Sequence, residues 1–121
     1  MELNTKKKGN LTELQCLAKF AEYGLTVSIP YGDCARYDFI LEINNKLYKV
    51  QCKTSSEEEI GVYKFSCRSC KTNASGNTRK SYTEDEVDFF CTMVKDKCYL
   101  IPFNETSTHT KTLRFIPPKN G

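Results

Sequence analysis

Two β-rich segments separated by a pair of asparagines constrain the fold more than any other feature of this sequence. The first segment is Tyr37–Ile43 and the second is Lys46–Thr54. Asn tolerates the positive φ values of a tight two-residue turn, so Asn44-Asn45 predicts a β-hairpin. Cross-strand partners in such a hairpin have position numbers with a constant sum. On this register Asp38 lies opposite Gln51, with about 5.5 Å between their Cβ atoms.

A helix is predicted ahead of the hairpin. Asn10 is placed as its N-cap, and Glu13 follows three residues later as in a capping box. Apolar side chains recur at helical spacing at Leu14, Leu17, Ala18 and Ala21. Gly24 ends the segment, so the helix is expected from about Leu11 to Tyr23. Residues 25–30 (LTVSIP) then predict a short strand and residues 31–36 (YGDCAR) a loop.

The second half of the chain predicts more strands. Residues 55–61 (SSEEEIG) are expected to be an exposed turn, and residues 62–67 (VYKFSC) a strand. Residues 68–81 are polar, basic and without periodicity, which predicts a mobile loop. Thr83 and Glu86 form a second helical start signal, and a hairpin follows between residues 88 and 103. An edge strand is expected at 113–116. This order predicts an α/β fold with a central mixed sheet flanked by helices.

Length and composition fit one folded domain, residues 1–121, because 39% of the residues are hydrophobic. The sequence has no apolar run long enough for a membrane span and no export signal, so a cytoplasmic protein is expected. The net charge of +3 is mild, but basic residues gather at Lys6–Lys8 and between Arg68 and Tyr82. These two segments suit a phosphate-rich partner, or they are a solvated surface.

The seven cysteines do not predict disulfides in a cytoplasmic protein. Cys16, Cys34 and Cys52 are interpreted as small core residues. A four-cysteine zinc site is conceivable from Cys67, Cys70, Cys91 and Cys98. The spacing of the second pair fits zinc poorly, and both of its members lie within predicted strands. Reduced buried thiols are therefore preferred and structural zinc is disfavoured.

The hairpin brings together side chains suited to phosphodiester chemistry. Gln51 and Lys53 share one face of their strand, and Asp38 faces them from the other arm. A carboxylate and an amide oxygen are hard donors that suit Mg²⁺, and the backbone carbonyl of Cys52 offers another oxygen. A lysine beside the metal can orient water or stabilise charge on a phosphate. An acid from the preceding helix, Glu13, would complete the set.

These residues resemble the PD-(D/E)xK nuclease superfamily. Its core is a helix with an acid, a hairpin arm with Asp, and a second arm with (D/E)-x-K. The segment GNLTELQCLAKFAEYGLTVSIPYGDCARYDFILEINNKLYKVQCKTS (9–55) and the later YTEDEVDFFCTMVKDKCYLIPF (82–103) are similar to the Q-x-K branch, which includes a group I intron homing endonuclease. Asp38 matches the family's Asp, and Gln51 and Lys53 match its second arm. The chain departs from the pattern at Tyr37, where the family has Pro, and at Gln51, where it has an acid.

The resemblance implies a Mg²⁺-dependent DNA endonuclease, with Mn²⁺ as a substitute ion. Asp38, Gln51, Lys53 and Glu13 would be catalytic, and the metal would bind Asp38, Gln51, Glu13 and the Cys52 carbonyl. The expected DNA-binding residues are Lys6, Lys7, Lys8, Arg36, Arg79, Lys80 and Tyr82. Homing, restriction-like and junction-resolving roles stay open. Cutting both DNA strands needs two active sites, so a homodimer or higher oligomer is expected. The alternative is a DNA-binding or assembly module that does not cleave.

Each site residue also has an interpretation without function. Glu13 could serve only as the capping-box Glu of its helix, and Gln51 as a plain cross-strand amide. Lys53 could be an exposed edge lysine. Asp38 is the hardest to dismiss, because an Asp beside an apolar strand is costly to bury unless it is paired. The lone histidine, His109, is expected at the surface.

Overall fold

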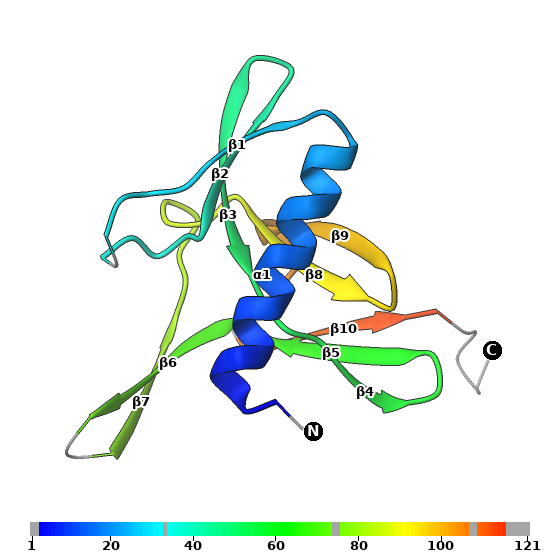
Figure 1. The fold of residues 1–121 in the computed structure, drawn as a ribbon. Helices are drawn as coiled ribbons and strands as arrows, with labels where there is room; N and C mark the ends of the chain where they lie inside the picture. The colour runs from blue at the N-terminus through cyan, green and yellow to red at the C-terminus, as the bar shows by residue number, and fades with distance from the viewer. Residues whose placement is uncertain (1–2, 33, 74–75, 107–108, 116–121) are drawn as a thin grey trace.

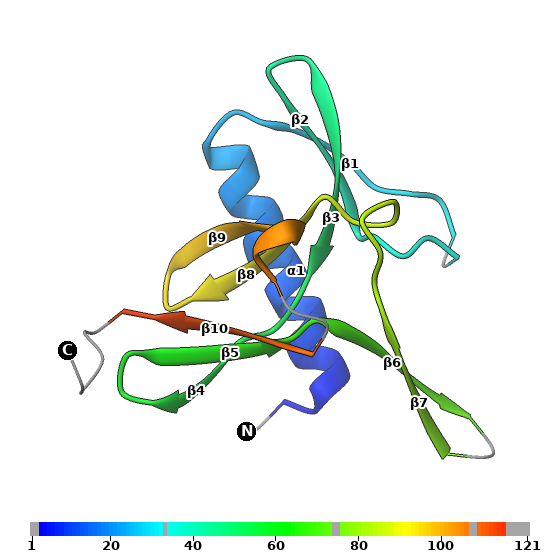
Figure 2. The same ribbon diagram turned by 180° about the vertical axis from the view of Figure 1, so that it is seen from behind.

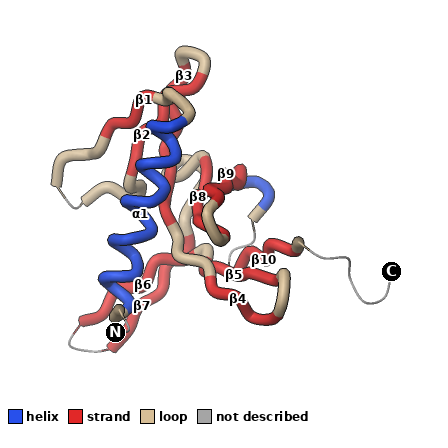
Figure 3. The backbone as a smooth tube through the Cα atoms, turned by 45° about the vertical axis from the view of Figure 1, so that its right-hand side comes forward, coloured by secondary structure: helices blue, strands red, loops and turns tan. Residues whose placement is uncertain are grey.

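A computed structural model describes residues 3–32, 34–73, 76–106 and 109–115, and within 70–73 and 76–78 only the backbone. Its centre is a five-stranded mixed sheet in the order β1-β2-β3-β8-β9. The strands are β1 (Thr26–Ser28), β2 (Phe39–Ile43), β3 (Lys46–Cys52), β8 (Phe89–Val94) and β9 (Lys97–Pro102). β3 and β8 pair in parallel, and the other neighbours pair antiparallel. Helix α1 (Thr5–Glu22) crosses one face of this sheet (Figures 1 and 3).

The remaining strands form two smaller sheets beside the central one. β4 (Ser56–Glu59), β5 (Val62–Ser66) and β10 (Thr110–Arg114) make an antiparallel sheet in the order β10-β5-β4. β6 (Arg68–Asn73) and β7 (Gly76–Ser81) make a two-stranded hairpin that projects from the body of the molecule (Figure 2). A short 3₁₀ helix, η1 (Phe103–Glu105), follows β9. No helix in the described part of the chain is long and apolar enough to cross a membrane.

The predicted β2–β3 hairpin is confirmed. Asn44 and Asn45 have φ values of 51° and 66°, as a two-residue turn that follows the strand twist requires. The pairing of Phe39 with Val50 keeps the predicted constant sum. The regular strand pairing ends at this pair, however, because the backbone N–H of Asp38 also donates to the carbonyl of Val50, at 2.9 Å. Two successive residues thus face Val50, and this irregularity moves Asp38 off the simple register.

The helix begins six residues earlier than predicted. Its N-cap is Asn4, whose side chain accepts the N–H of Lys7 at 2.9 Å, and not Asn10. Lysine is a good helix former, and Gly9 is tolerated in the interior of the helix. Lys6–Lys8 therefore lie in the first turns of α1 and not ahead of it. Glu13 is in mid-helix, so its capping-box interpretation is wrong.

Two segments expected to be irregular are strands. Residues 56–59, predicted as a turn, form β4, and the predicted mobile loop forms the β6–β7 hairpin. Neither segment alternates polar and apolar residues, and all four residues of β4 are exposed, so periodicity did not predict these strands. The signal at Thr83 yields a single turn, in which the N–H groups of Glu86 and Val87 bond the Thr83 carbonyl. The final strand is found as β10, slightly earlier than expected, and Ile116 lies outside the described residues.

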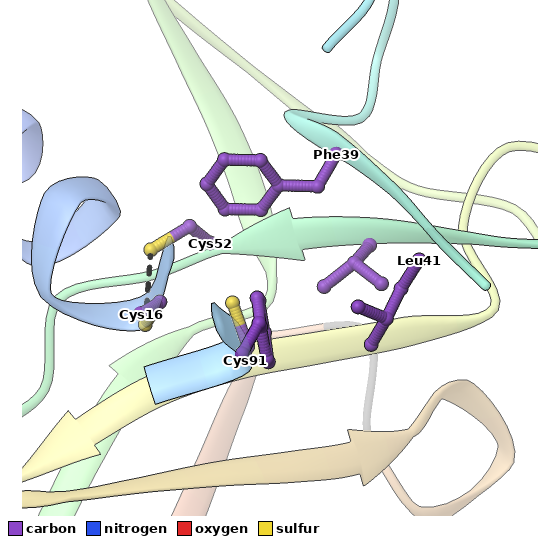
Figure 4. Packing of buried hydrophobic residues seen from close by; sticks show 7 residues of the cluster. Cys16, Phe39, Leu41, Cys52 and Cys91 are labelled. Atoms are coloured by element: carbon purple, nitrogen blue, oxygen red, sulfur yellow. Dashed lines mark hydrogen bonds between the residues drawn. The ribbon is translucent and has the colours of Figure 1, made fainter. Parts of the chain in front are cut away.

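The core lies on both faces of the central sheet. Between α1 and the sheet, buried residues are Cys16, Phe20, Phe39, Leu41, Val50, Cys52 and Cys91 (Figure 4). On the opposite face a second cluster holds Phe65, Cys67, Tyr82, Val87, Phe90 and Ile101. β8 lies between the two, with Cys91 on the helix side and Phe90 on the other. β8 is thus buried on both faces, as expected of a strand with a parallel neighbour.

Candidate active site

Two carboxyl groups from distant segments meet at one end of the central sheet. Glu13 comes from the middle of α1, and Asp38 directly precedes β2. Both line a pocket of about 300 Å³, together with apolar side chains such as Leu14, Leu17 and Ile29. The pairing of an α1 residue with the start of the hairpin follows from the packing of this helix on the sheet. No local pattern in the sequence specifies it.

A hydrogen bond links the two carboxyl groups, and it perturbs the pKa of each. Partial burial raises the pKa of Glu13 to about 7, and the charge of Asp38 and a hydrogen bond with its carboxylate add to the rise. Burial also raises the pKa of Asp38. The hydrogen bonds from the Cys52 N–H and from Glu13 lower this pKa and so oppose the rise. The proton therefore resides on Glu13, which donates to Asp38. A pair of acids held this close is a natural place for a cation.

Asp38 is held by the backbone of β3. Its Oδ2 accepts the N–H of Cys52 at 2.9 Å. The carbonyl of Cys52 in turn accepts the side-chain amide of Gln51 at 3.2 Å. This hydrogen bond uses the Nε2 donor of Gln51, so the Oε1 atom of Gln51 takes no part in it. The carboxylates, the amide oxygen and this carbonyl are all hard oxygen donors, the set that Mg²⁺ prefers, so the residues fit such an ion.

Lys53 lies on the face of the sheet opposite α1. Its Nζ donates to the carbonyl of Arg68 at 2.8 Å and lies 5.0 Å from the centre of the Tyr82 ring. Partial burial lowers the pKa of Lys53, while the negative charge of Asp38 opposes that shift. The backbone N–H of Lys53 bonds the Cys91 carbonyl at 2.8 Å, which extends the β3–β8 pairing to the site. The lysine is therefore fixed in place and is not a loose edge residue.

Arg36 organises the surroundings of Lys53. Its guanidinium lies 4.1 Å from the centre of the Tyr82 ring and forms an ion pair of 3.0 Å with Glu86. It also donates to the carbonyls of Ser81 and Lys80 and to the hydroxyl of Ser69, at 2.9, 3.2 and 2.6 Å. These contacts connect the loop before β2 to the base of the β6–β7 hairpin. The sequence offered no signal for them, since the partners are more than thirty residues away.

The helix is anchored to the active-site strand by two threonines that the sequence interpretation missed. The hydroxyl of Thr12 lies 3.0 Å from that of Thr54 and also donates to the Lys8 carbonyl at 2.9 Å. Thr12 precedes Glu13, and Thr54 follows Lys53. The contact thus fixes the helix register beside the two catalytic candidates.

The residues predicted to bind DNA divide into two groups. Lys6, Lys7, Lys8, Arg79 and Lys80 are exposed. Arg36 is half-buried, and Tyr82 retains only 8% of its exposure. Near the exposed group, a polar groove of about 400 Å³ is lined in part by Lys64, Arg68, Arg79 and His109. His109 is exposed as predicted, while Asp33 lies outside the described residues.

The cysteine predictions are partly confirmed. Cys16 and Cys52 are buried, but Cys34 is exposed, so its assignment to the core is wrong. The four cysteines considered for a zinc site, Cys67, Cys70, Cys91 and Cys98, do not form one cluster among the side chains that the structure describes. Cys67 belongs to the cluster on one face of the sheet and Cys91 to the cluster on the other, and the Cys70 side chain lies outside the described residues.

Comparison with known proteins agrees with this geometry. A family model of PD-(D/E)XK endonucleases matches residues 3–121, and the chain belongs to this family. Among solved structures, the chain is similar to the bacterial homing endonuclease I-Ssp6803I, with a TM-score of 0.74 and 25% identity. The match covers 97% of this chain and 81% of that one. No curated protein matches the chain. The expected restriction-endonuclease-like fold is thus confirmed, with one α-helix against the central sheet in the described residues.

Proposed function

We propose that this endonuclease is a single Mg²⁺-dependent domain that hydrolyses phosphodiester bonds in DNA. The observation that carries the proposal is the position of Asp38, which contacts Glu13 of α1 and the Cys52 amide of β3, with the charge of Lys53 nearby. A helix acid and a hairpin acid thereby meet, and the strand lysine lies near enough for its charge to act on Asp38. Structural packing alone would not require three ionisable groups at the end of a sheet.

Each residue has a distinct role in this proposal. Asp38 and Glu13 hold the cation, and Gln51 and the Cys52 carbonyl supply further oxygens. When bound, the ion would polarise the scissile phosphate and lower the pKa of water. Lys53 holds or accepts a proton of the attacking water and stabilises charge on the phosphate. Water attacks phosphorus and the bond to the 3′ oxygen breaks, which leaves a 5′-phosphate.

The surroundings suggest how DNA would lie. The exposed basic residues Lys6–Lys8, Arg79 and Lys80 would contact phosphates, with Arg68 in the neighbouring groove. Arg36 and Tyr82 are better suited to positioning Lys53, because their polar atoms or rings are already used inside the protein. Since Arg68 supplies both a groove residue and the carbonyl that holds Lys53, DNA in this groove would lie next to the active site.

The similarity to a homing endonuclease favours a homing role over restriction-like or resolving roles. Cleavage of both strands would then use two active sites in a homodimer or higher oligomer. A cytoplasmic location stays a prediction. One observation favours the alternative of a binding module that does not cleave. Gln51 offers a neutral amide where a carboxylate would bind a divalent ion more strongly.

Cleavage of supercoiled and branched DNA with Mg²⁺ or Mn²⁺ tests the proposal. Asp38→Ala and Lys53→Ala should each reduce the rate by roughly 10²–10⁴-fold, because each removes a group that acts in the transition state. Asp96→Ala and Lys97→Ala, at the exposed β8–β9 turn, are matched controls that should retain the parent rate. DNA binding without cleavage by the parent protein would establish the binding module. Cleavage that survives both active-site changes would place the active site elsewhere.

A further inference from the structure

Three of the seven cysteines converge on one point in the core, away from any C-x-x-C pattern, and a fourth packs beside them. Cys16 comes from α1, Cys52 from β3 and Cys91 from β8. Their sulfur atoms all lie within 4.8 Å of one another. The Cys16 and Cys52 sulfur atoms are 3.8 Å apart. Figure 4 shows this contact as a dashed line, with the Cys91 side chain beside it. Cys98, on β9, packs against the same cluster and contacts the Cys16 and Cys91 thiols.

One sulfur–sulfur distance in this cluster equals that of a thiolate metal site. A tetrahedral site with Zn–S bonds of about 2.3 Å has about 3.8 Å between its sulfur atoms. The Cys16–Cys52 separation is 3.8 Å. None of the four cysteines is in a disulfide, so all four sulfur atoms are available as ligands. The strand pairing also favours convergence, because Cys52 and Cys91 are direct partners in the parallel β3–β8 ladder.

We propose that Cys16, Cys52, Cys91 and Cys98 bind one Zn²⁺ ion as a structural site, independent of the Mg²⁺ of catalysis. Soft thiolates select Zn²⁺ over the hard ions that the carboxylate site prefers. Four thiolates around Zn²⁺ carry two negative charges, which are costly to bury. Cys98 is only half-buried and Lys19 acts on it electrostatically, so the cluster is open to a compensating charge on this side. The negative charges of Asp38 and Glu13 oppose ionisation of Cys52, so this positive compensation matters.

Packing as small apolar residues is the competing explanation. It accounts for one or two buried thiols, since reduced cysteine is often buried. It does not explain why three sulfur atoms from three different elements lie within 4.8 Å of one another, with the Cys98 thiol in contact with two of them, when alanine or valine would fill the same core. The sequence spacing conceals the site, because 36 residues separate Cys16 from Cys52 and 39 separate Cys52 from Cys91.

A metal here would brace the nuclease site. Cys52 lies between Gln51 and Lys53, and its N–H holds the Asp38 carboxylate. Cys16 lies one helical turn after Glu13, so it moves with the helix acid. An ion that joins Cys16 to Cys52 therefore ties the two segments that carry the paired carboxyl groups. We expect the ion to stabilise the fold, as structural zinc does in other proteins.

Metal analysis of the full chain tests the proposal without any measurement of cleavage. The untagged protein, purified with a non-chelating reductant, should contain about one zinc per chain. Replacement by Co²⁺ should give the sulfur-to-cobalt charge-transfer and ligand-field bands of a tetrahedral thiolate site. Cys16→Ser and the half-exposed Cys98→Ser should each lose zinc or shift these bands. Cys67→Ser, an equally buried control in the other cluster, should not.

Several results would overturn the zinc site. A folded parent protein without zinc that gives no thiolate bands with Co²⁺ would show that the thiols only pack. The metal would lie elsewhere if Cys16→Ser and Cys98→Ser kept all their zinc and unchanged Co²⁺ bands. Loss of zinc in Cys67→Ser would also place the metal elsewhere. A Cys16–Cys52 disulfide detected by mass spectrometry would replace the metal with a covalent link. Because Cys98→Ser changes a half-exposed position, it keeps the test informative if Cys16→Ser does not fold.

Discussion

The hydrogen bond between Glu13 and Asp38 makes a quantitative prediction about stability and pH. In the folded protein Glu13 keeps its proton up to about pH 7, whereas in the unfolded chain it is lost near its usual pKa of 4.5. Stability that is fully present below pH 4.5 is therefore lost as the pH rises through about 7. The substitution Glu13→Gln preserves shape and hydrogen bonding but cannot ionise. It should remove this loss.

The magnitude follows from the change in pKa. A rise from 4.5 to about 7 corresponds to roughly 3 kcal/mol, at about 1.4 kcal/mol per pH unit. Glu13 is only half-buried, so solvent screening reduces this figure, and we expect about 1–2 kcal/mol. The free energy of unfolding of Glu13→Gln, minus that of the parent, should rise by this amount between pH 4.5 and pH 8.

Urea denaturation followed by circular dichroism, in buffers without added divalent ions, measures this difference at each pH. Both proteins share every other titrating group, so the difference isolates the Glu13–Asp38 pair. Glu84→Gln, at an exposed position, is the matched control and should follow the parent. Added Mg²⁺ at pH 8 should stabilise the parent more than Glu13→Gln, because binding to the folded state shifts the equilibrium. A parent and a variant with the same pH dependence would refute a hydrogen bond from a protonated Glu13 to Asp38.

Two further predictions concern the surroundings of the site. Arg36→Ala should lower the free energy of unfolding by about 2 kcal/mol, because it removes the ion pair with Glu86, the contact with the Tyr82 ring and the hydrogen bonds to the Ser81 and Lys80 carbonyls. Thermal denaturation of Arg36→Ala, compared with Arg36→Lys, which keeps the charge, measures this loss of stability. An unchanged melting midpoint in Arg36→Ala would contradict the prediction. Arg79→Ala should reduce the slope of log K against log salt for DNA binding by about 0.9, the value for one phosphate contact. A slope equal to that of the parent and of Lys97→Ala would remove Arg79 from the DNA surface.

The β2–β3 hairpin could be predicted because its determinants are local. Two adjacent asparagines adopt the positive φ values of the turn, and the turn then fixes the pairing from Ile43↔Lys46 to Phe39↔Val50. Asp38 and Lys53 were predicted within the two arms, and the structure places Asp38 directly before β2 and Lys53 directly after β3. Local rules did not show the irregularity at Asp38. That depends on the backbone bond to Val50 at the end of the ladder.

Errors arose where a local signal had a competitor. Asn10 and Glu13 satisfy a capping box, yet Asn4 is the cap, because three lysines continue the helix and Thr12 is held against Thr54. Residues 68–81 show no alternation of polar and apolar residues, so no local pattern predicted the β6–β7 hairpin. Their hairpin is instead fastened at its base, where Arg36 bonds residues of both strands.

The sequence by itself determined the chemistry available to this protein: a hairpin with an acid on one arm and Gln-x-Lys on the other, after a helix that carries Glu13. Only the tertiary structure decided how these groups behave. Packing of α1 on the sheet brings Glu13 to Asp38, and the β6–β7 segment supplies the carbonyl that holds Lys53. The same packing gathers the thiols of Cys16, Cys52 and Cys91. Turns are set by the φ preferences of adjacent residues, whereas these contacts join residues far apart in the chain, whose spacing encodes nothing about their distance.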